Sequence, residues 1–115
     1  MSGAKLMKIE EIRGLLGLAR RAALLSIGSR ETRTALRRGE IRLVLLAEDA
    51  SPRDRARLER VAEEEGVPAR TVESRASLGA AIGAGDVTVV GVRDRGMAEA
   101  LEARLAGIEG GGRSR

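Results

Sequence analysis

Residues 43–54 read LVLLAEDASPRD, and this stretch decides the class of fold. Its first five residues are apolar without alternation, which predicts a central strand covered on both faces. Ser51 suits the N-cap of a helix, Pro52 its first position and Asp54 its third, where a capping acid belongs. A buried strand therefore passes through a short turn into a helix.

The same alternation of strand and helix extends in both directions along the chain. Helices are expected at about 7–21, 29–38, 52–65, 75–82 and 96–105, and strands at 24–27, 43–47, 67–72 and 87–92. Alternating elements favour a sheet between two helical layers. We expect an α/β fold, a three-layer α/β/α sandwich with a mixed, mostly parallel sheet of about four strands. Residues 1–108 would form one domain, followed by a disordered Gly/Arg tail at 109–115.

The composition excludes several kinds of chemistry. The 115 residues contain no Cys, no His and no aromatic residue. The chain therefore lacks a thiolate nucleophile, an imidazole base, the usual zinc ligands and disulfides, so catalysis, if any, would fall to carboxylates, Lys or hydroxyls, and we expect no cofactor. Base-stacking platforms for RNA are excluded too. No apolar run approaches the ~18 residues of a membrane span, and no signal peptide is evident, so a monomeric cytoplasmic protein without a membrane partner is expected.

Basic charge is concentrated in the first part of the chain. Residues 1–42 hold ten basic and four acidic residues, whereas residues 43–115 hold eleven and thirteen. Such a distribution is typical of proteins that bind phosphate groups, nucleic acids among them. The alternative is an arginine-rich, solvated surface of a GC-rich genome, since 19 of the 21 basic residues are Arg.

The first candidate site is the turn at Gly28 and the helix that it opens. A strand that passes through glycine into a helix leaves N–H groups unpaired at the positive end of the helix dipole. The candidate residues for anion binding are Gly28, Ser29, Arg30, Glu31, Arg33, Arg37 and Arg38. The alternative is an ordinary glycine turn before a solvated helix.

The second candidate is another strand-to-helix junction, Val72-Glu73-Ser74-Arg75-Ala76. Parallel strands end at the same edge of a sheet, so this junction and the Gly28 turn are expected to form one surface. The alternative reading of Ser74 is a simple N-cap.

A third, weaker possibility is a Mg²⁺ site. Glu48 and Asp49 follow one strong strand and Asp94 follows the other, so three carboxylates could meet at one edge. The alternative is that these residues cap helices and form turns. The glycine-rich stretch 79–85 lacks the order of a phosphate-binding loop.

Four segments together resemble a known family. They are LLGLARRA at 15–22, LVLLAEDAS at 43–51, VESRASLGAAIG at 72–83 and VVGVRDRG at 89–96. In order and spacing they are similar to the bacterial YlxQ-like branch of the ribosomal protein L7Ae superfamily, over about residues 9–105.

This resemblance implies an α/β/α sandwich that binds RNA kink-turns and performs no catalysis. In the family, a helix start grips tandem sheared G·A pairs, and a nearby loop covers a flipped-out nucleotide. By this resemblance, Gly28 would let the backbone approach the RNA, Glu31 would accept a hydrogen bond from a guanine edge, and Arg30 would replace a cationic residue. The loop at 73–76 would meet the looped-out base.

Two positions depart from the family pattern, and one of them is Leu24, at a place where relatives often carry a Lys. Thr34 stands where relatives carry a Lys, and it has no long cationic donor for guanine acceptors. Arg33, Arg37 or Arg38 would have to replace that donor from other angles. Structured RNA, such as a kink-turn or ribosomal RNA, is therefore the first expected partner. The alternative is a module that docks ribosomal proteins or other proteins of the translation or transcription machinery.

Overall fold

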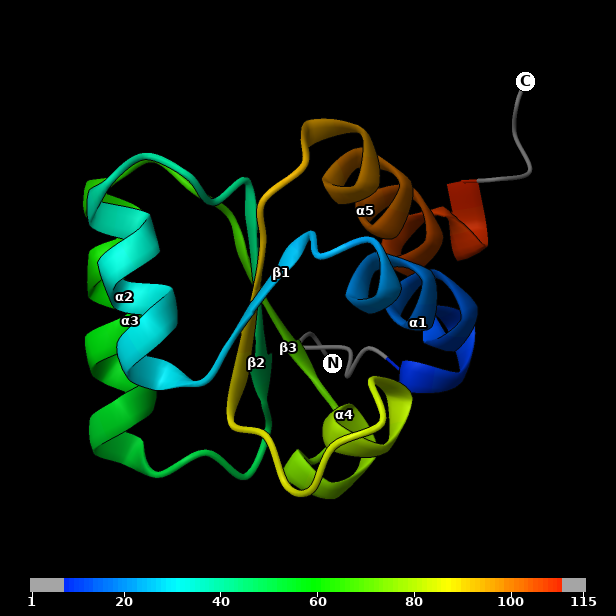
Figure 1. Cartoon of the computed structure of the whole chain (residues 1–115), viewed down its shortest axis with the longest axis horizontal. Coiled ribbons are helices and arrows are strands. Elements are labelled where there is room, and N and C mark those ends of the chain that lie inside the picture. The colour runs from blue at the N-terminus through cyan, green and yellow to red at the C-terminus, as the bar shows by residue number, and fades with distance from the viewer. Residues whose placement is uncertain (1–7, 111–115) are drawn as a thin grey trace.

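The computed structural model describes residues 8–110 of the chain, in which helices and strands alternate (Figure 1). A short 3₁₀ helix, η1, precedes the first α-helix. The elements are η1 (Ile9–Glu11), α1 (Arg13–Arg21), β1 (Leu25–Ile27), α2 (Ser29–Arg37), β2 (Leu43–Ala47), α3 (Pro52–Glu64), β3 (Ala69–Val72), α4 (Arg75–Ala81), β4 (Val89–Val92) and α5 (Arg95–Gly110). The predicted order of elements is confirmed.

The four strands form one mixed sheet in the order β1-β4-β2-β3. β2 pairs with β3 in parallel, whereas β4 lies antiparallel to both β1 and β2. The mixed four-stranded sheet is as predicted, but only one of its three pairings is parallel. The reason is that β4, although it comes last in the chain, inserts between β1 and β2 and reverses direction.

This arrangement fixes which loops can meet. β1, β2 and β3 point the same way, so they end at one edge of the sheet, where β4 begins. We call this the Gly28 edge; it carries Gly28, Glu48 and Glu73 after the three strand ends and Thr88 before β4. The end of β4 lies at the opposite edge.

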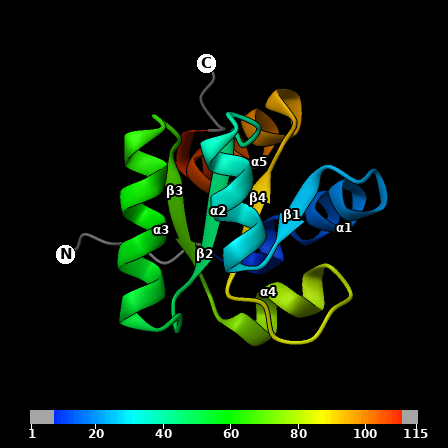
Figure 2. The same ribbon diagram turned by 60° about the vertical axis from the view of Figure 1, so that its left-hand side comes forward.

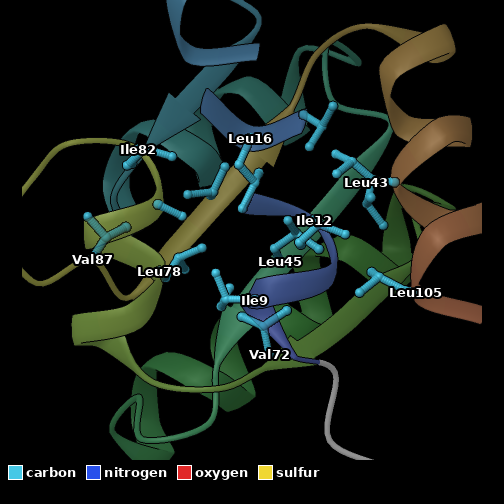
Figure 3. Packing of buried hydrophobic residues seen from close by; sticks show 14 of the residues in the cluster. Ile9, Ile12, Leu16, Leu43, Leu45, Val72, Leu78, Ile82, Val87 and Leu105 are labelled. Carbon is cyan, nitrogen blue, oxygen red and sulfur yellow. The ribbon is translucent and has the colours of Figure 1, made fainter. Parts of the chain in front are cut away.

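Helices cover both faces of the sheet. α2 and α3 lie on one face, and α1, α4 and α5 lie on the other (Figures 1 and 2). The larger of the two aliphatic cores lies under α1, α4 and α5, where Leu16, Leu45 and Leu78 converge (Figure 3). The three-layer sandwich inferred from the sequence is confirmed.

Several boundaries differ from the sequence-based expectation. The first helix is divided, because Ile12 has φ −123° and breaks the helical geometry between η1 and α1. β3 begins only at Ala69, after Pro68, which cannot donate a backbone hydrogen bond. α5 continues through Gly110, so the first two residues of the predicted tail are helical. Residues 111–115 of that tail lie outside the described residues.

A close contact between α2 and the sheet positions the candidate site. Gly91 in β4 faces α2, and a Cβ atom placed there would lie 2.5 Å from Ser26 Oγ and 3.1 Å from Thr32 Cγ2. The absence of that side chain lets α2 approach the sheet closely. Among residues 8–110, no helix is both long enough and apolar enough to cross a membrane.

Candidate nucleic-acid interface

The start of α2 is open to an external acceptor. Gly28 adopts φ +100° and ψ 161°, a conformation that only glycine takes readily, and its N–H donates to Val89 O at 2.9 Å. Within residues 8–110, the N–H groups of Ser29, Arg30 and Glu31 meet no acceptor, since Gly28 has no side chain to cap the helix.

Three other helices begin differently. Ser51 Oγ accepts from Asp54 N at the start of α3, and Ser74 Oγ accepts from Ser77 N at the start of α4. At the start of α5, Asp94 Oδ2 accepts from Met97 N at 2.8 Å. A side-chain oxygen therefore occupies each of these helix starts, whereas α1, which follows η1, and α2 begin without a side-chain cap. Of these two, the start of α2 lies at the Gly28 edge beside exposed arginines, so its donors are available to a ligand.

Backbone hydrogen bonds bring the two predicted junctions to the same short segment. Gly28 N donates to Val89 O, and Val87 N donates to Arg75 O at 3.0 Å. Val87 and Val89 are only two residues apart in the chain, so one short segment contacts both junctions. The expectation that both junctions lie at one edge is confirmed (Figure 2).

The second junction is largely occupied by its own contacts. Ser74 is the N-cap of α4, as the simpler alternative held. Arg75 donates its backbone N–H to Asp49 Oδ1 at 2.8 Å, and its Nε lies 3.6 Å from Asp49 Oδ2. Ala76 and the guanidinium of Arg75 remain exposed, and Glu73 is half-buried.

Val72 must be removed from the predicted RNA contacts. Its side chain is fully buried in the core beneath α1 and α4, and its carbonyl accepts a hydrogen bond from Glu48 N at 2.9 Å. As the last residue of β3 it faces the interior, so it supports the junction without presenting a side chain to a ligand.

On α2, the exposed side chains divide into two flanks. Arg30, Thr34 and Arg38 are exposed along a groove that Glu31 also lines. Arg93, from the end of β4, reaches this groove, and its Nη2 lies 3.7 Å from Glu31 Oε2. Arg93 also donates to Glu40 Oε1 at 2.7 Å. Arg93 is therefore a charged neighbour of Glu31, the carboxylate that the family pattern assigns to RNA binding. Nothing in the sequence near residue 31 predicted this neighbour.

Arg37, on the other flank, is already engaged. It donates to Glu64 Oε1 at 2.7 Å and to Glu65 Oε2 at 3.1 Å, both at the end of α3. These hydrogen bonds, that to Glu64 foremost, raise the pKa of Arg37 above its ordinary value. Arg37 therefore stays protonated at neutral pH. Deprotonation would break this pairing only at a pH above the ordinary guanidinium pKa. Arg37 thus carries a cation that is already paired within the protein, and its contact with RNA stays a prediction.

The proposed Mg²⁺ site is wrong. β4 runs opposite to the other strands, so Asp94 lies at the far edge and caps α5, while Glu48 and Asp49 lie at the Gly28 edge. Asp49 is moreover bonded to Arg75. Residues 8–110 contain no group of three or more carboxylates close enough to hold a metal ion.

The sequence analysis did not identify three arginines near the candidate site, Arg55, Arg57 and Arg60. Arg55 donates to Ala47 O at 2.8 Å and to Thr71 Oγ1 at 3.1 Å, which ties the ends of β2 and β3 together at the Gly28 edge. Arg57 and Arg60 line a groove between α2 and α3. The signal for the second pair was present as the spacing of basic residues along 53–60.

Together these features provide donors and cationic groups on one surface. Unpaired N–H groups at a helix start bind anionic or carbonyl oxygens, and guanidinium groups bind phosphates or the acceptor atoms of guanine. The carboxylate of Glu31 adds an acceptor beside them. The arrangement can recognise a polyanion that also presents polar groups, as RNA does.

Comparison with known proteins gives a consistent result. The sequence model of the ribosomal protein L7Ae/L30e/S12e/Gadd45 family matches residues 10–102. A curated protein of Bacillus subtilis (strain 168), named RNA-binding protein YlxQ, is 40% identical over 87 residues, which cover 76% of this chain and 87% of that protein.

Two solved structures are similar in fold. A protein of unknown function from Bacillus halodurans is 34% identical, with a TM-score of 0.79 and coverage of 81% of this chain and 94% of that chain. The 15.5kD RNA binding protein of Giardia lamblia is 26% identical, with a TM-score of 0.70 and coverage of 89% and 84%.

Proposed function

The chain belongs to the ribosomal protein L7Ae/L30e/S12e/Gadd45 family, and we propose that it binds structured RNA, specifically RNA with a kink-turn-like bend. The names of its relatives in Bacillus subtilis and Giardia lamblia, both described as RNA-binding, support this proposal. The binding surface is the Gly28 edge, and its main element is the start of α2, which follows the outermost strand, β1.

The observation that carries the proposal is the open start of α2. Gly28 is the N-cap of a helix whose first-turn N–H groups have no acceptor in the described part of the chain, while α3, α4 and α5 are capped by side-chain oxygens. No atom would contact a Cβ at Gly28 within 4 Å, so the space before the helix is free for a ligand.

Each side chain of this helix start has a proposed role. Gly28 and Ser29 allow the RNA to approach the backbone, and Arg30 contacts phosphate or a guanine edge. Glu31 accepts a hydrogen bond from a guanine edge in a sheared G·A pair. Thr34 lacks a cationic group, and Arg38, exposed one turn later, is the residue on the same groove that replaces it.

The junction after β3 completes the surface. Glu73, Arg75 and Ala76 lie at the same edge, and the exposed guanidinium of Arg75 stacks on or contacts the looped-out nucleotide. Ser74 acts by capping α4, which keeps this junction in place.

We further propose that the protein acts as a monomer on RNA of the translation apparatus in the cytoplasm, without catalysis or a cofactor. The family description, which names ribosomal proteins, supports the association with translation. The family match and the name of the Bacillus subtilis relative, which describes RNA binding, support the absence of catalysis.

A gel-shift comparison tests the proposal. The full chain is titrated against a kink-turn RNA and a straight hairpin of the same length. Glu31→Gln and Arg30→Gln are expected to weaken kink-turn binding at least tenfold and hairpin binding much less. Glu99→Gln and Arg95→Gln make the same charge changes on α5, away from the Gly28 edge, and are expected to leave both affinities unchanged.

Equal binding of both RNAs by the unaltered chain would contradict kink-turn recognition. In that case the alternative, a module that docks proteins of the translation or transcription machinery, becomes the better account. An affinity that does not fall as salt rises would contradict contacts with phosphate.

A further inference from the structure

A second basic surface lies between α2 and α3, on the face of the sheet opposite α1 and α5. It is a groove of about 330 Å³, which we call the arginine groove, lined by Arg33, Thr34, Arg37, Arg57, Arg60 and Val61. Figure 2 shows α2 and α3 side by side on one face of the sheet. None of these lining residues is acidic, so four guanidinium groups share one concave surface.

The spacing of these arginines explains why they meet. Arg33 and Arg37 are one turn apart on α2, and Arg57 and Arg60 follow i, i+3 on α3. Residues at such spacing share one face of a helix. Because both helices begin at the Gly28 edge and run the same way, the two rows face each other across the groove.

Most of this charge has no partner in the protein. Within residues 8–110, Arg33, Arg57 and Arg60 form no ion pair and no side-chain hydrogen bond, whereas Arg37 is paired with acidic residues at the end of α3. The pairing of Arg37 therefore closes the far end of the groove, and the end nearer the Gly28 edge remains unpaired.

Arg33 gives an independent indication of a ligand. Its Nε atom is buried and has no hydrogen-bond partner, although the residue lies at the edge of the groove. A buried guanidinium N–H without an acceptor is unfavourable, and buried polar groups in proteins are almost always satisfied. The Nη groups of Arg33 are not buried and have no partner within residues 8–110, so they are the donors that an anion in the groove can reach.

The chemistry of the lining selects the phosphate backbone of a nucleic acid. Guanidinium groups bind phosphate oxygens through paired hydrogen bonds, and no aromatic side chain is present on which a base could stack. On α2 the lining residues extend from Arg33 to Arg37, about 6 Å along the helix axis. The groove therefore presents several guanidinium groups to one short stretch of backbone.

We propose that the arginine groove binds the sugar-phosphate backbone of the RNA stem that continues beyond the open start of α2. This inference rests on the proposed RNA-binding function and extends it. The start of α2 recognises the bend of the RNA. The groove binds phosphates and so adds affinity without recognising the sequence or the shape of the RNA. The two surfaces share α2, so one RNA can contact both.

The test compares two double variants with the same loss of charge. Arg57→Gln/Arg60→Gln removes two unpaired cations from the groove. Arg42→Gln/Arg95→Gln removes two exposed cations from the opposite edge of the sheet. Each protein is titrated with kink-turn RNAs that carry a short or a long stem, and with a straight duplex, over a series of salt concentrations. Thermal unfolding followed by circular dichroism verifies that each variant is folded.

The groove variant is expected to lose most of the affinity that the unaltered protein gains from the longer stem. The slope of log affinity against log salt should decrease by about one to two units, since each phosphate contact contributes ~0.9 in duplex DNA. The preference for the kink-turn over the straight duplex should persist, because the helix start is intact. The opposite-edge variant should retain the stem-length gain and the slope.

Two results would overturn the inference: an unchanged slope and stem-length gain in the groove variant, or the same losses in both double variants. The same experiment distinguishes a failure of the proposed kink-turn recognition from a failure of the groove inference. If the unaltered protein does not prefer the kink-turn, yet the groove variant still shows a reduced slope on the straight duplex, the groove is supported and kink-turn recognition is not.

Discussion

The hydroxyl groups of Ser26 and Thr32 are hydrogen-bonded at 2.8 Å, and both residues are completely buried. Ser26 lies in β1 and Thr32 in the first turn of α2, so this bond ties the strand to the helix across the Gly28 turn. The helix start that carries the proposed RNA site is thus held in place by a buried polar contact and by its close approach to Gly91.

The first prediction concerns this hydroxyl pair. Thr32→Val keeps the shape of the side chain but leaves Ser26 Oγ buried without a partner, which is expected to cost about 1–3 kcal/mol. Urea unfolding followed by circular dichroism measures the loss, since the chain has no aromatic residue for fluorescence. Ser26→Ala/Thr32→Val should lose less than the sum of the two single variants. Strictly additive losses would show that the hydroxyls are not coupled.

The second prediction concerns the space between α2 and the sheet. Gly91→Ala would place a methyl group 2.5 Å from Ser26 Oγ and 2.9 Å from Ile41 Cδ1, so α2 would have to move outward. We expect a loss of about 1–3 kcal/mol in the free energy of unfolding, together with weaker RNA binding. Gly85→Ala, where no atom lies within 4 Å of the added group, is the control. Equal stability of the two variants would contradict the tight packing.

The third prediction separates backbone conformation from space. Gly28→Ala meets no atom within 4 Å, but at φ +100° it is strained, at an expected cost of about 1–3 kcal/mol. A relaxed turn would also misplace the first N–H groups of α2, so kink-turn affinity should fall at least tenfold. Gly14→Ala, likewise unobstructed but within α1, should raise stability by up to ~1 kcal/mol and leave binding unchanged. Unaltered RNA binding by Gly28→Ala would remove the helix start from the site.

The fourth prediction concerns Arg93 as a positioning residue for Glu31. Arg93 pairs with Glu31 at 3.7 Å and with Glu40 at 2.7 Å, and both pairs are partly exposed, so Arg93→Gln should lower the free energy of unfolding by no more than about 1–2 kcal/mol. Kink-turn affinity should nevertheless fall several-fold, because the carboxylate loses its fixed neighbour. Glu31→Gln/Arg93→Gln should bind no more weakly than Glu31→Gln alone. Additive losses would mean that Arg93 contacts the RNA independently.

The fifth prediction ranks two arginines on the same flank of α2. Arg33 has an unpaired Nε, whereas Arg37 is bonded to Glu64 and Glu65. Arg33→Gln should therefore lower the salt dependence of RNA binding by nearly one phosphate contact, and Arg37→Gln should lower it less. Titration at several salt concentrations distinguishes the two. A larger effect for Arg37 would show that RNA displaces its acidic partners.

The local parts of this protein could be predicted because each depends on residues close in sequence. The apolar run at 43–47 is a fully buried strand, and Ser51 and Ser74 cap the helices that follow. The turn at Gly28 is equally local, since its positive φ requires glycine. Secondary-structure propensity, helix capping and hydrophobic periodicity act over a few residues, so they can be recognised from the sequence.

The sequence alone determined the order of elements, the two-layered helical cover and the glycine turn that opens α2. Only the tertiary structure decided the direction and position of β4, because an apolar strand can pair either way and its sequence pattern carries no direction. That choice separated Asp94 from Asp49, brought Arg93 to Glu31, and placed Gly91 beneath α2. Packing α2 beside α3 likewise joined Arg37 to Glu64 and formed the arginine groove from two segments far apart in the chain.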